Sequence, residues 1–291
     1  MVHADYNHAG GKAGIPPSVP IMSILWLRVA LGFYTIGLIY ALLALSRREG
    51  VLNRIALPAM GLGMAFQFVA LTEAVLLSGL TLTSVHNAES LLSLLIMAAF
   101  MVAYVVYRTN SPGIVVFPLV FLLTAVAATG QQPFLLTSSV MARGWLFAHI
   151  TLVLAGYAGL FLSFSASLLY LVQERNLKSK NSGGLLSRLP ALQIMDDIGY
   201  KSLLLGFPCM TVGLILGVVM AEATFHRVDY LDPKIFLSLL TWAVYLLLVY
   251  TRWNAGWRGR KAAYLATGAF VIAVVAWSAN YFSTIHRFVR S

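Results

Sequence analysis

Eight long apolar stretches constrain the fold of this chain more than any other feature. They cover residues 21–45, 55–79, 88–107, 114–130, 144–172, 202–222, 235–251 and 262–282. A helix needs about 20 mostly apolar residues to cross the ~30 Å hydrocarbon core of a bilayer, and these runs are far too long for the strands of a barrel. The sequence therefore predicts an all-α fold, a polytopic membrane helix bundle with about eight transmembrane helices.

The composition supports this prediction and excludes several classes of protein. Hydrophobic residues make up 59% of the 291 residues and charged residues 10%, against roughly 25% charged in ordinary globular domains. A soluble enzyme, a disordered regulator and a disulfide scaffold are excluded. The single cysteine, Cys209, cannot form an internal disulfide or a C-x-x-C redox pair, and no C-x-x-C-H motif for covalent haem is present.

The distribution of Lys and Arg predicts the orientation. Thirteen of the 20 basic residues fall in the loops after the first, third, fifth and seventh spans, six fall on the opposite face, and Arg28 lies inside the first span. The positive-inside rule then places both termini outside. We assign the net charge of +10 to these loops, not to a nucleic-acid partner. Residues 1–20 lack the pattern of a signal peptide and are interpreted as an outer polar tail, before a transmembrane domain at 21–288.

Histidines are the most informative polar residues. All six (His3, His8, His86, His149, His226 and His286) lie outside or in the outer part of a span on this topology. The last four belong to four separate elements at similar depth, and imidazole is a common ligand of haem iron, zinc and copper. Zinc favours three or four ligands with a short-spaced pair, which this sequence lacks. A single haem near the outer surface, which needs two axial ligands, fits better.

His149 is the strongest of these candidates because it interrupts an apolar run, and polar residues inside spans are candidates for function by default. Arg143, just before this span, and Trp145, at its start, could provide a partner for a haem propionate and an aromatic wall. Alternative interpretations stay open. Trp145 could belong to an interfacial aromatic belt and Arg143 could lie near lipid headgroups, while His86 and His226 could be interfacial residues without a ligand.

Acidic residues allow both structural and functional interpretations. Asp232 precedes Pro233, a pairing typical of a helix start. Asn87 and Glu89 match an N-cap and a first-turn acid. Glu73 could pair with Arg28 or serve a proton path, as a small-solute transporter would require. In the segment of about 173–201, Leu186, Leu189, Leu192 and Met195 recur at helical spacing, which indicates either a short helix on the membrane surface or a simple connector.

Several segments resemble a known family. They are "LVLAGYAGLFLSFSASLLYLVQERNLKSK" after His149, "LPALQIMDDIGYKSLLLGFPCMTVGLILGVVMAE", "DPK" at Asp232 to Lys234, "TWAVYLLLVYTRWNAGWRGRKAAYLA" and "NYFSTIHRF", preceded by "NAES" at Asn87 to Ser90. Their order resembles the cytochrome c assembly family, the CcsA/ResC and CcmC haem-handling proteins, and especially its short eight-span HemX/YpjD-like members. The resemblance covers about residues 80–288.

The resemblance implies a role and a site. His149 and His286 match two histidines that ligate haem iron on either side of an outer tryptophan-rich loop, and Asp232 matches the aspartate that closes this loop. The family implies non-covalently bound haem, haem handling in cytochrome c biogenesis without substrate turnover, the bacterial cytoplasmic (inner) membrane, a second membrane subunit and, indirectly, apocytochrome c as partners.

The chain also departs from the family pattern. Residues 223–234 contain no tryptophan, and Ile235 and Phe236 stand where an acidic residue is expected. This favours haem binding or an accessory role over full presentation of haem to apocytochrome c. A structural or regulatory subunit that has lost haem, and a small-solute transporter, are the alternatives.

Overall fold

The computed structural model describes residues 21–46, 52–77, 85–129, 140–178, 191–225 and 233–278. These segments contain no strand and form one π-helical turn, η1 (Leu52–Ala56), and eight α-helices: α1 (Ile21–Ser46), α2 (Leu57–Leu77), α3 (Val85–Tyr107), α4 (Gly113–Ala128), α5 (Val140–Lys178), α6 (Leu192–Phe225), α7 (Pro233–Trp253) and α8 (Arg260–Ser278). Seven are long and apolar enough to cross a membrane, and α4 is a shorter apolar helix. The predicted all-α, multi-pass architecture is confirmed.

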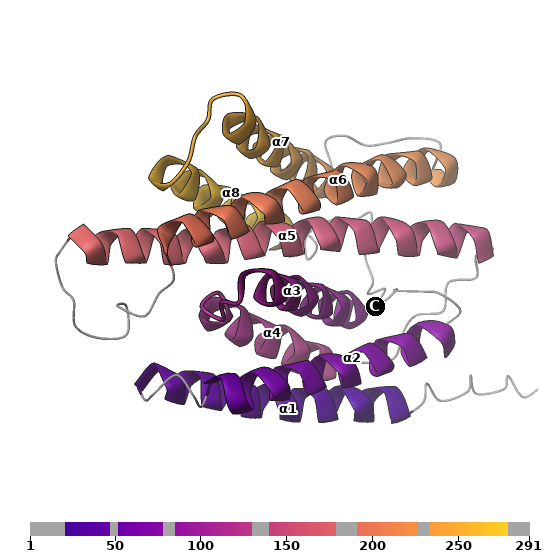
Figure 1. Cartoon of the computed structure of the whole chain (residues 1–291). Coiled ribbons are helices and arrows are strands. Elements are labelled where there is room, and N and C mark those ends of the chain that lie inside the picture. Colours follow the sequence, from indigo (N-terminus) through magenta and orange to yellow (C-terminus); the bar gives the residue numbers. More distant parts are fainter. Residues whose placement is uncertain are drawn as a thin grey trace, which may run out of the picture.

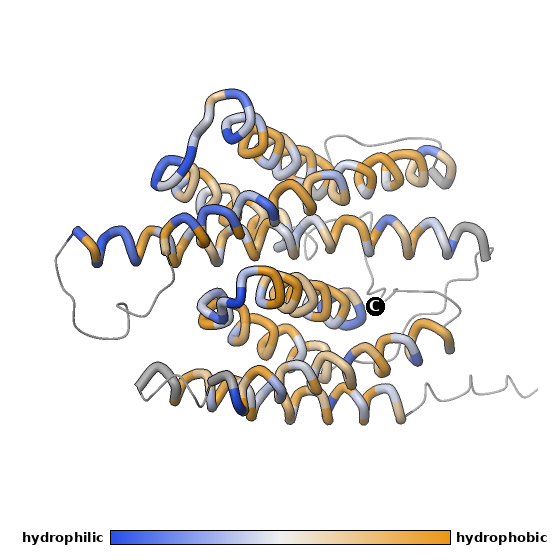
Figure 2. Tube along the Cα trace, in the orientation of Figure 1, coloured by the Kyte–Doolittle hydropathy of each residue, from blue (hydrophilic) through white to orange (hydrophobic). Residues whose placement is uncertain are grey.

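The helices form two groups that meet where α3 packs against α5 (Figure 1). Helices α1–α4 make the first group, and α5–α8 make the second. Successive helices run in opposite directions, so the α3–α4 and α7–α8 turns share one end of the bundle with the end of α5 (Figure 1). This basic end carries the exposed cations Arg54, Arg108, Arg175, Lys178, Lys201, Arg258, Arg260 and Lys261, and Figure 2 shows its hydrophilic character. The opposite end, with His86 and His149, is the histidine end.

Two sequence-based expectations are wrong about helix boundaries. Residues 179–190 of the expected surface segment, with Leu186 and Leu189, lie outside the described residues. Its last part, from Leu192, is not a separate element, because α6 runs without interruption over 34 residues from there. Asn87 is not an N-cap, because α3 begins two residues earlier, at Val85. Helix α5 has 39 residues, which is roughly 58 Å at ~1.5 Å per residue. Both α5 and α6 therefore exceed the thickness of the hydrocarbon core.

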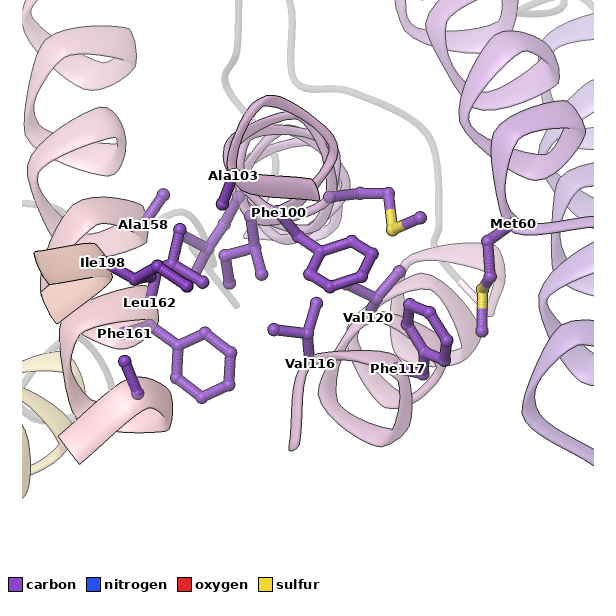
Figure 3. Packing of buried hydrophobic residues seen from close by; sticks show 14 of the residues in the cluster. Met60, Phe100, Ala103, Val116, Phe117, Val120, Ala158, Phe161, Leu162 and Ile198 are labelled. Atoms are coloured by element: carbon purple, nitrogen blue, oxygen red, sulfur yellow. The ribbon is translucent and has the colours of Figure 1, made fainter. Parts of the chain in front are cut away.

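The main apolar core surrounds α3. Figure 3 shows Phe100 of α3 among side chains of α4, with residues of α5 and α6 on the other side of the helix. Phe100 and Phe117 meet edge to face, with 5.1 Å between ring centroids, a favourable geometry for aromatic pairs. Both rings are buried. This core joins the two helix groups through α3.

A buried polar network ties the four helices of the first group together. The Tyr34 hydroxyl donates to Gln67 Oε1 at 2.7 Å, and Gln67 Nε2 donates to the Ser90 carbonyl at 3.0 Å. Thr124 on α4 joins through contacts with Gln67 Nε2 at 3.4 Å and with the Ser93 hydroxyl at 2.7 Å. Because a polar group in lipid must be satisfied internally, the network fixes how these helices pack.

Helices α5 and α6 approach so closely that their backbones touch. A Cβ added at Gly159 would lie 2.8 Å from the Ser202 carbonyl oxygen and 2.9 Å from Gly206 Cα. A Cβ at Gly206 would overlap the Tyr245 hydroxyl of α7. Small residues allow such close approach between helices in membranes, so this glycine seam sets the spacing of the second group.

An ion pair closes the basic end of the second group. Arg252 Nη1 on α7 donates to both carboxylate oxygens of Asp196 on α6, at 2.8 Å each. The same carboxylate accepts the backbone N–H of Gly259 at 3.1 Å. Gly259 has φ +65°, and its Cα faces the Tyr170 hydroxyl, which would lie 2.6 Å from an added Cβ. One aspartate thus joins α6, α7 and the α7–α8 turn.

Candidate functional site

His149 lies on α5 and points toward α6. Its Nδ1 is 2.7 Å from the carbonyl oxygen of Gly213, and its ring is half-buried. A backbone carbonyl can only accept, so this hydrogen bond requires the proton to be on Nδ1. The lone pair of the neutral ring then belongs to Nε2, the atom that would ligate a metal.

Gly217 provides the room for this ring. A Cβ at Gly217 would lie 2.5 Å from His149 Cε1 and 2.8 Å from Nδ1, so any other residue would displace the imidazole. Gly213 and Gly217 stand one turn apart on the same side of α6. The first provides the acceptor and the second provides the space, and together they form a cradle that fixes the orientation of the ring.

This arrangement matches the environment of a metal-ligating histidine. Such a histidine nearly always donates its other ring N–H to a carboxylate, a backbone carbonyl or water, which fixes the tautomer and raises the basicity of the ligating nitrogen. The donor set is imidazole nitrogen, which suits haem iron. The residues present therefore fit a haem ligand.

The two other candidates on α5 differ in their surroundings. Trp145 stands one turn before His149 on the same side of the helix, and its side chain is 51% exposed. Arg143 is half-buried, and its Nε is buried without a hydrogen-bond partner among the residues described. Trp145 can therefore cover a ligand beside His149. The Arg143 guanidinium can donate further hydrogen bonds to such a ligand.

His86 makes contacts of a structural kind. Its Nδ1 lies 3.2 Å from the carbonyl oxygen of Val126, near the end of α4, and 3.7 Å from Glu89 Oε2. The Thr129 hydroxyl donates to the same carbonyl at 2.7 Å. His86 thus joins the start of α3 to the end of α4, in the first helix group, whereas His149 belongs to the second.

Three predicted site residues, His226, His286 and Asp232, lie outside the described residues. Pro233 is the first residue of α7, as the Asp-Pro pattern predicts for a helix start. Within the six described segments, no three His, Cys, Asp or Glu side chains gather where they could hold a metal ion.

The possible ion pair between Glu73 and Arg28 is not formed among the described residues. Arg28 is exposed on α1 and Glu73 is half-buried on α2. None of the ion pairs among the described residues includes either side chain.

Sequence reasoning missed the residues that orient His149. Gly213 and Gly217 form a G-x-x-x-G pattern, which indicates only helix packing. The additional signal is the imidazole of His149 on the facing helix α5. To recognise that it lies opposite these two glycines, one needs the register of α5 against α6. Asp196 and Arg252 were missed as a pair for the same reason, because 56 residues separate them.

Comparison with known proteins places most of the chain in one family. Residues 23–286 match the model of the family described as "Cytochrome C assembly protein".

Individual relatives are similar over long segments. Protein HemX of Brevibacillus brevis is 29% identical over 195 residues, which cover 67% of this chain and 70% of the relative. The cytochrome c biogenesis protein CcsA of Crocosphaera subtropica is 26% identical over 251 residues, with 67% and 75% covered. The protein of the same name from Chlamydomonas reinhardtii is 31% identical over 134 residues, with 45% and 36% covered.

Proposed function

The chain belongs to the cytochrome C assembly protein family, and on that premise we propose that it binds haem non-covalently, with His149 as an axial ligand. The family match and the CcsA relatives support a role in cytochrome c biogenesis. The protein handles haem and does not turn over a substrate.

The observation that carries this proposal is the cradle around His149. The Gly213 carbonyl holds the proton on Nδ1 and Gly217 leaves space for the ring, so α6 pre-orients Nε2 as a ligand.

Haem would supply an iron that histidine side chains can bind, and the chain's own residues would hold the porphyrin in place. His286 is the proposed second ligand, and Asp232 is proposed to contribute to the same site. Trp145 provides an apolar cover, and the Arg143 guanidinium pairs with a propionate through charge-assisted hydrogen bonds. His86, which joins α3 to α4 in the first helix group, is not a ligand in this proposal, and neither is His226.

The proposal includes a location and partners. The protein lies in the bacterial cytoplasmic membrane with the histidine end and both termini outside, since the basic end then faces the cytoplasm. A second membrane subunit completes the assembly system and contacts apocytochrome c.

A visible spectrum of the full-length protein in detergent, oxidised and reduced, tests the ligand assignment. We expect sharp bands of reduced low-spin haem in the wild type, their loss in His149→Ala and in His286→Ala, and their retention in the matched control His86→Ala. In His149→Gly, added imidazole restores the bands, because it fills the vacated position. If both single variants His149→Ala and His286→Ala keep the spectrum, the assignment is wrong.

One observation favours a second candidate function. The loop at residues 223–234 has no tryptophan, so the protein could be a structural or regulatory subunit that has lost haem. That function predicts no haem spectrum even after reconstitution, together with a cytochrome c assembly complex that still depends on the protein.

A further inference from the structure

One side of α1 is exposed along its whole length and carries two residues that do not suit contact with lipid alone. The exposed positions recur at intervals of three and four residues and include Leu25, Arg28, Gly32, Ile36 and Ile39. Such spacing places them on one face of the helix. We name this surface the Arg28 face.

Arg28 places a permanent positive charge within the membrane. It lies six residues from the start of the span Met22–Leu43, about 9 Å along the helix axis. Charged side chains in transmembrane segments almost always face a bundle interior, line a cavity or pair with another group. Arg28 points away from the bundle, and no carboxylate lies within ion-pair distance of it in the part of the chain that the structure describes.

Gly32 leaves an opening one turn further along the same face. A Cβ added there would have nothing within 4 Å, so packing among the described residues does not require its small size. This contrasts with Gly37 on the same helix, where an added Cβ would lie 2.8 Å from Met60 Cγ. In membranes, small exposed residues let a second helix approach closely and polar side chains then bond across the contact.

We propose that the Arg28 face docks a transmembrane helix of a second protein, and that this helix carries a carboxylate at the depth of Arg28. The inference rests on the second membrane subunit of the proposed function and assigns it a surface. Gly32 permits close contact between the two helices. The ion pair between Arg28 and the carboxylate is buried in this contact and makes it specific for that partner. A second copy of this chain does not fit, because a two-fold axis along the membrane normal would bring two Arg28 side chains together.

Photo-cross-linking of the full-length protein in its native membrane tests this assignment. A photoreactive phenylalanine derivative replaces Ile36 on the Arg28 face or, as a control, Leu205 on the exposed side of α6. We expect a membrane-protein adduct at Ile36 only. Its yield falls about ten-fold in Arg28→Gln, the size of one interhelical polar contact in a membrane, and is retained in Arg28→Lys.

Further variants distinguish the contribution of the Arg28 charge from that of the small size of Gly32. Gly32→Leu removes the adduct, whereas Gly268→Leu, at another glycine with an open Cβ position, leaves it unchanged. Arg175→Gln removes an exposed charge at the basic end and has no effect. The decisive result is rescue: Arg28→Glu loses the adduct, and reversal of one acidic residue in the captured helix to Arg restores it.

Three results would overturn the proposal: adducts to lipid only, adducts to a second copy of this chain, or a yield that is insensitive to Arg28→Gln. The first of these would mean that Arg28 reaches the lipid headgroups instead. The adduct does not depend on haem, so it is expected in His149→Ala as well. A failure of the haem assignment and a failure of the docking assignment are therefore distinguishable.

Discussion

Replacement of Arg252 by methionine removes the ion pair that closes the basic end and keeps most of the apolar volume. The Arg252 side chain is 7% exposed and that of Asp196 is 20% exposed. The variant leaves the Asp196 carboxylate with the Gly259 N–H as its remaining donor among the described residues. It also removes the guanidinium from the face of the Tyr200 ring, 5.4 Å from its centroid.

The expected loss of unfolding free energy is about 3 kcal/mol. Removal of one partner of a buried ion pair costs about 3–5 kcal/mol, and the partial exposure of Asp196 places this pair at the lower end. The matched control is Lys201→Gln, which removes the pair with Asp197, where the two side chains are 55% and 50% exposed. An exposed pair contributes at most about 1 kcal/mol.

Unfolding in detergent by increasing fractions of dodecyl sulfate, followed by circular dichroism, measures both variants. We also expect the double variant Asp196→Leu/Arg252→Met to recover much of the stability, because it removes the unpaired buried charge. The reasoning is refuted if Arg252→Met destabilises the protein no more than Lys201→Gln does.

Three further variants test other parts of the fold by the same unfolding assay. Gly206→Ala should cost more than about 2 kcal/mol, because its Cβ would overlap the Tyr245 hydroxyl; a neutral result would contradict the close contact of α6 with Tyr245 on α7. Gly259→Ala should cost more than Gly256→Ala, since both have positive φ but only Gly259 faces a crowded side chain, and equal losses would argue against that crowding. Gln67→Leu should cost about 1–3 kcal/mol by leaving the buried Tyr34 hydroxyl without its acceptor, which a stability equal to wild type would disprove.

The number of helices could be predicted from the sequence because lipid imposes a simple requirement. Each crossing needs a long apolar run, and all eight helices overlap the predicted stretches. The helix boundaries were harder to predict from the sequence where a helix continues beyond its apolar run. The segment 192–201 contains Asp196 and Asp197, and its charges resemble those of a surface segment although they belong to the first turns of α6.

The candidate site shows a different limit. His149 could be selected from the sequence because a polar residue inside an apolar run is costly. The residues that orient it could not, since the register of α5 on α6 decides which carbonyl meets Nδ1. The contacts of His86 with Val126 and Glu89 likewise depend on where α4 ends relative to the start of α3.

The shortness of α4 has a consequence for the surrounding bilayer. Its 16 residues span roughly 24 Å, about 6 Å less than an average hydrocarbon core. Gly113, its first residue, already lies against Phe100, two turns before α3 ends, and the turn that follows α3 buries Thr109 and Ser111 at this level. A hydrophobic stretch shorter than the bilayer is commonly accommodated by local thinning, so we expect compressed lipids beside α4 at the basic end and a larger energetic penalty in thicker membranes.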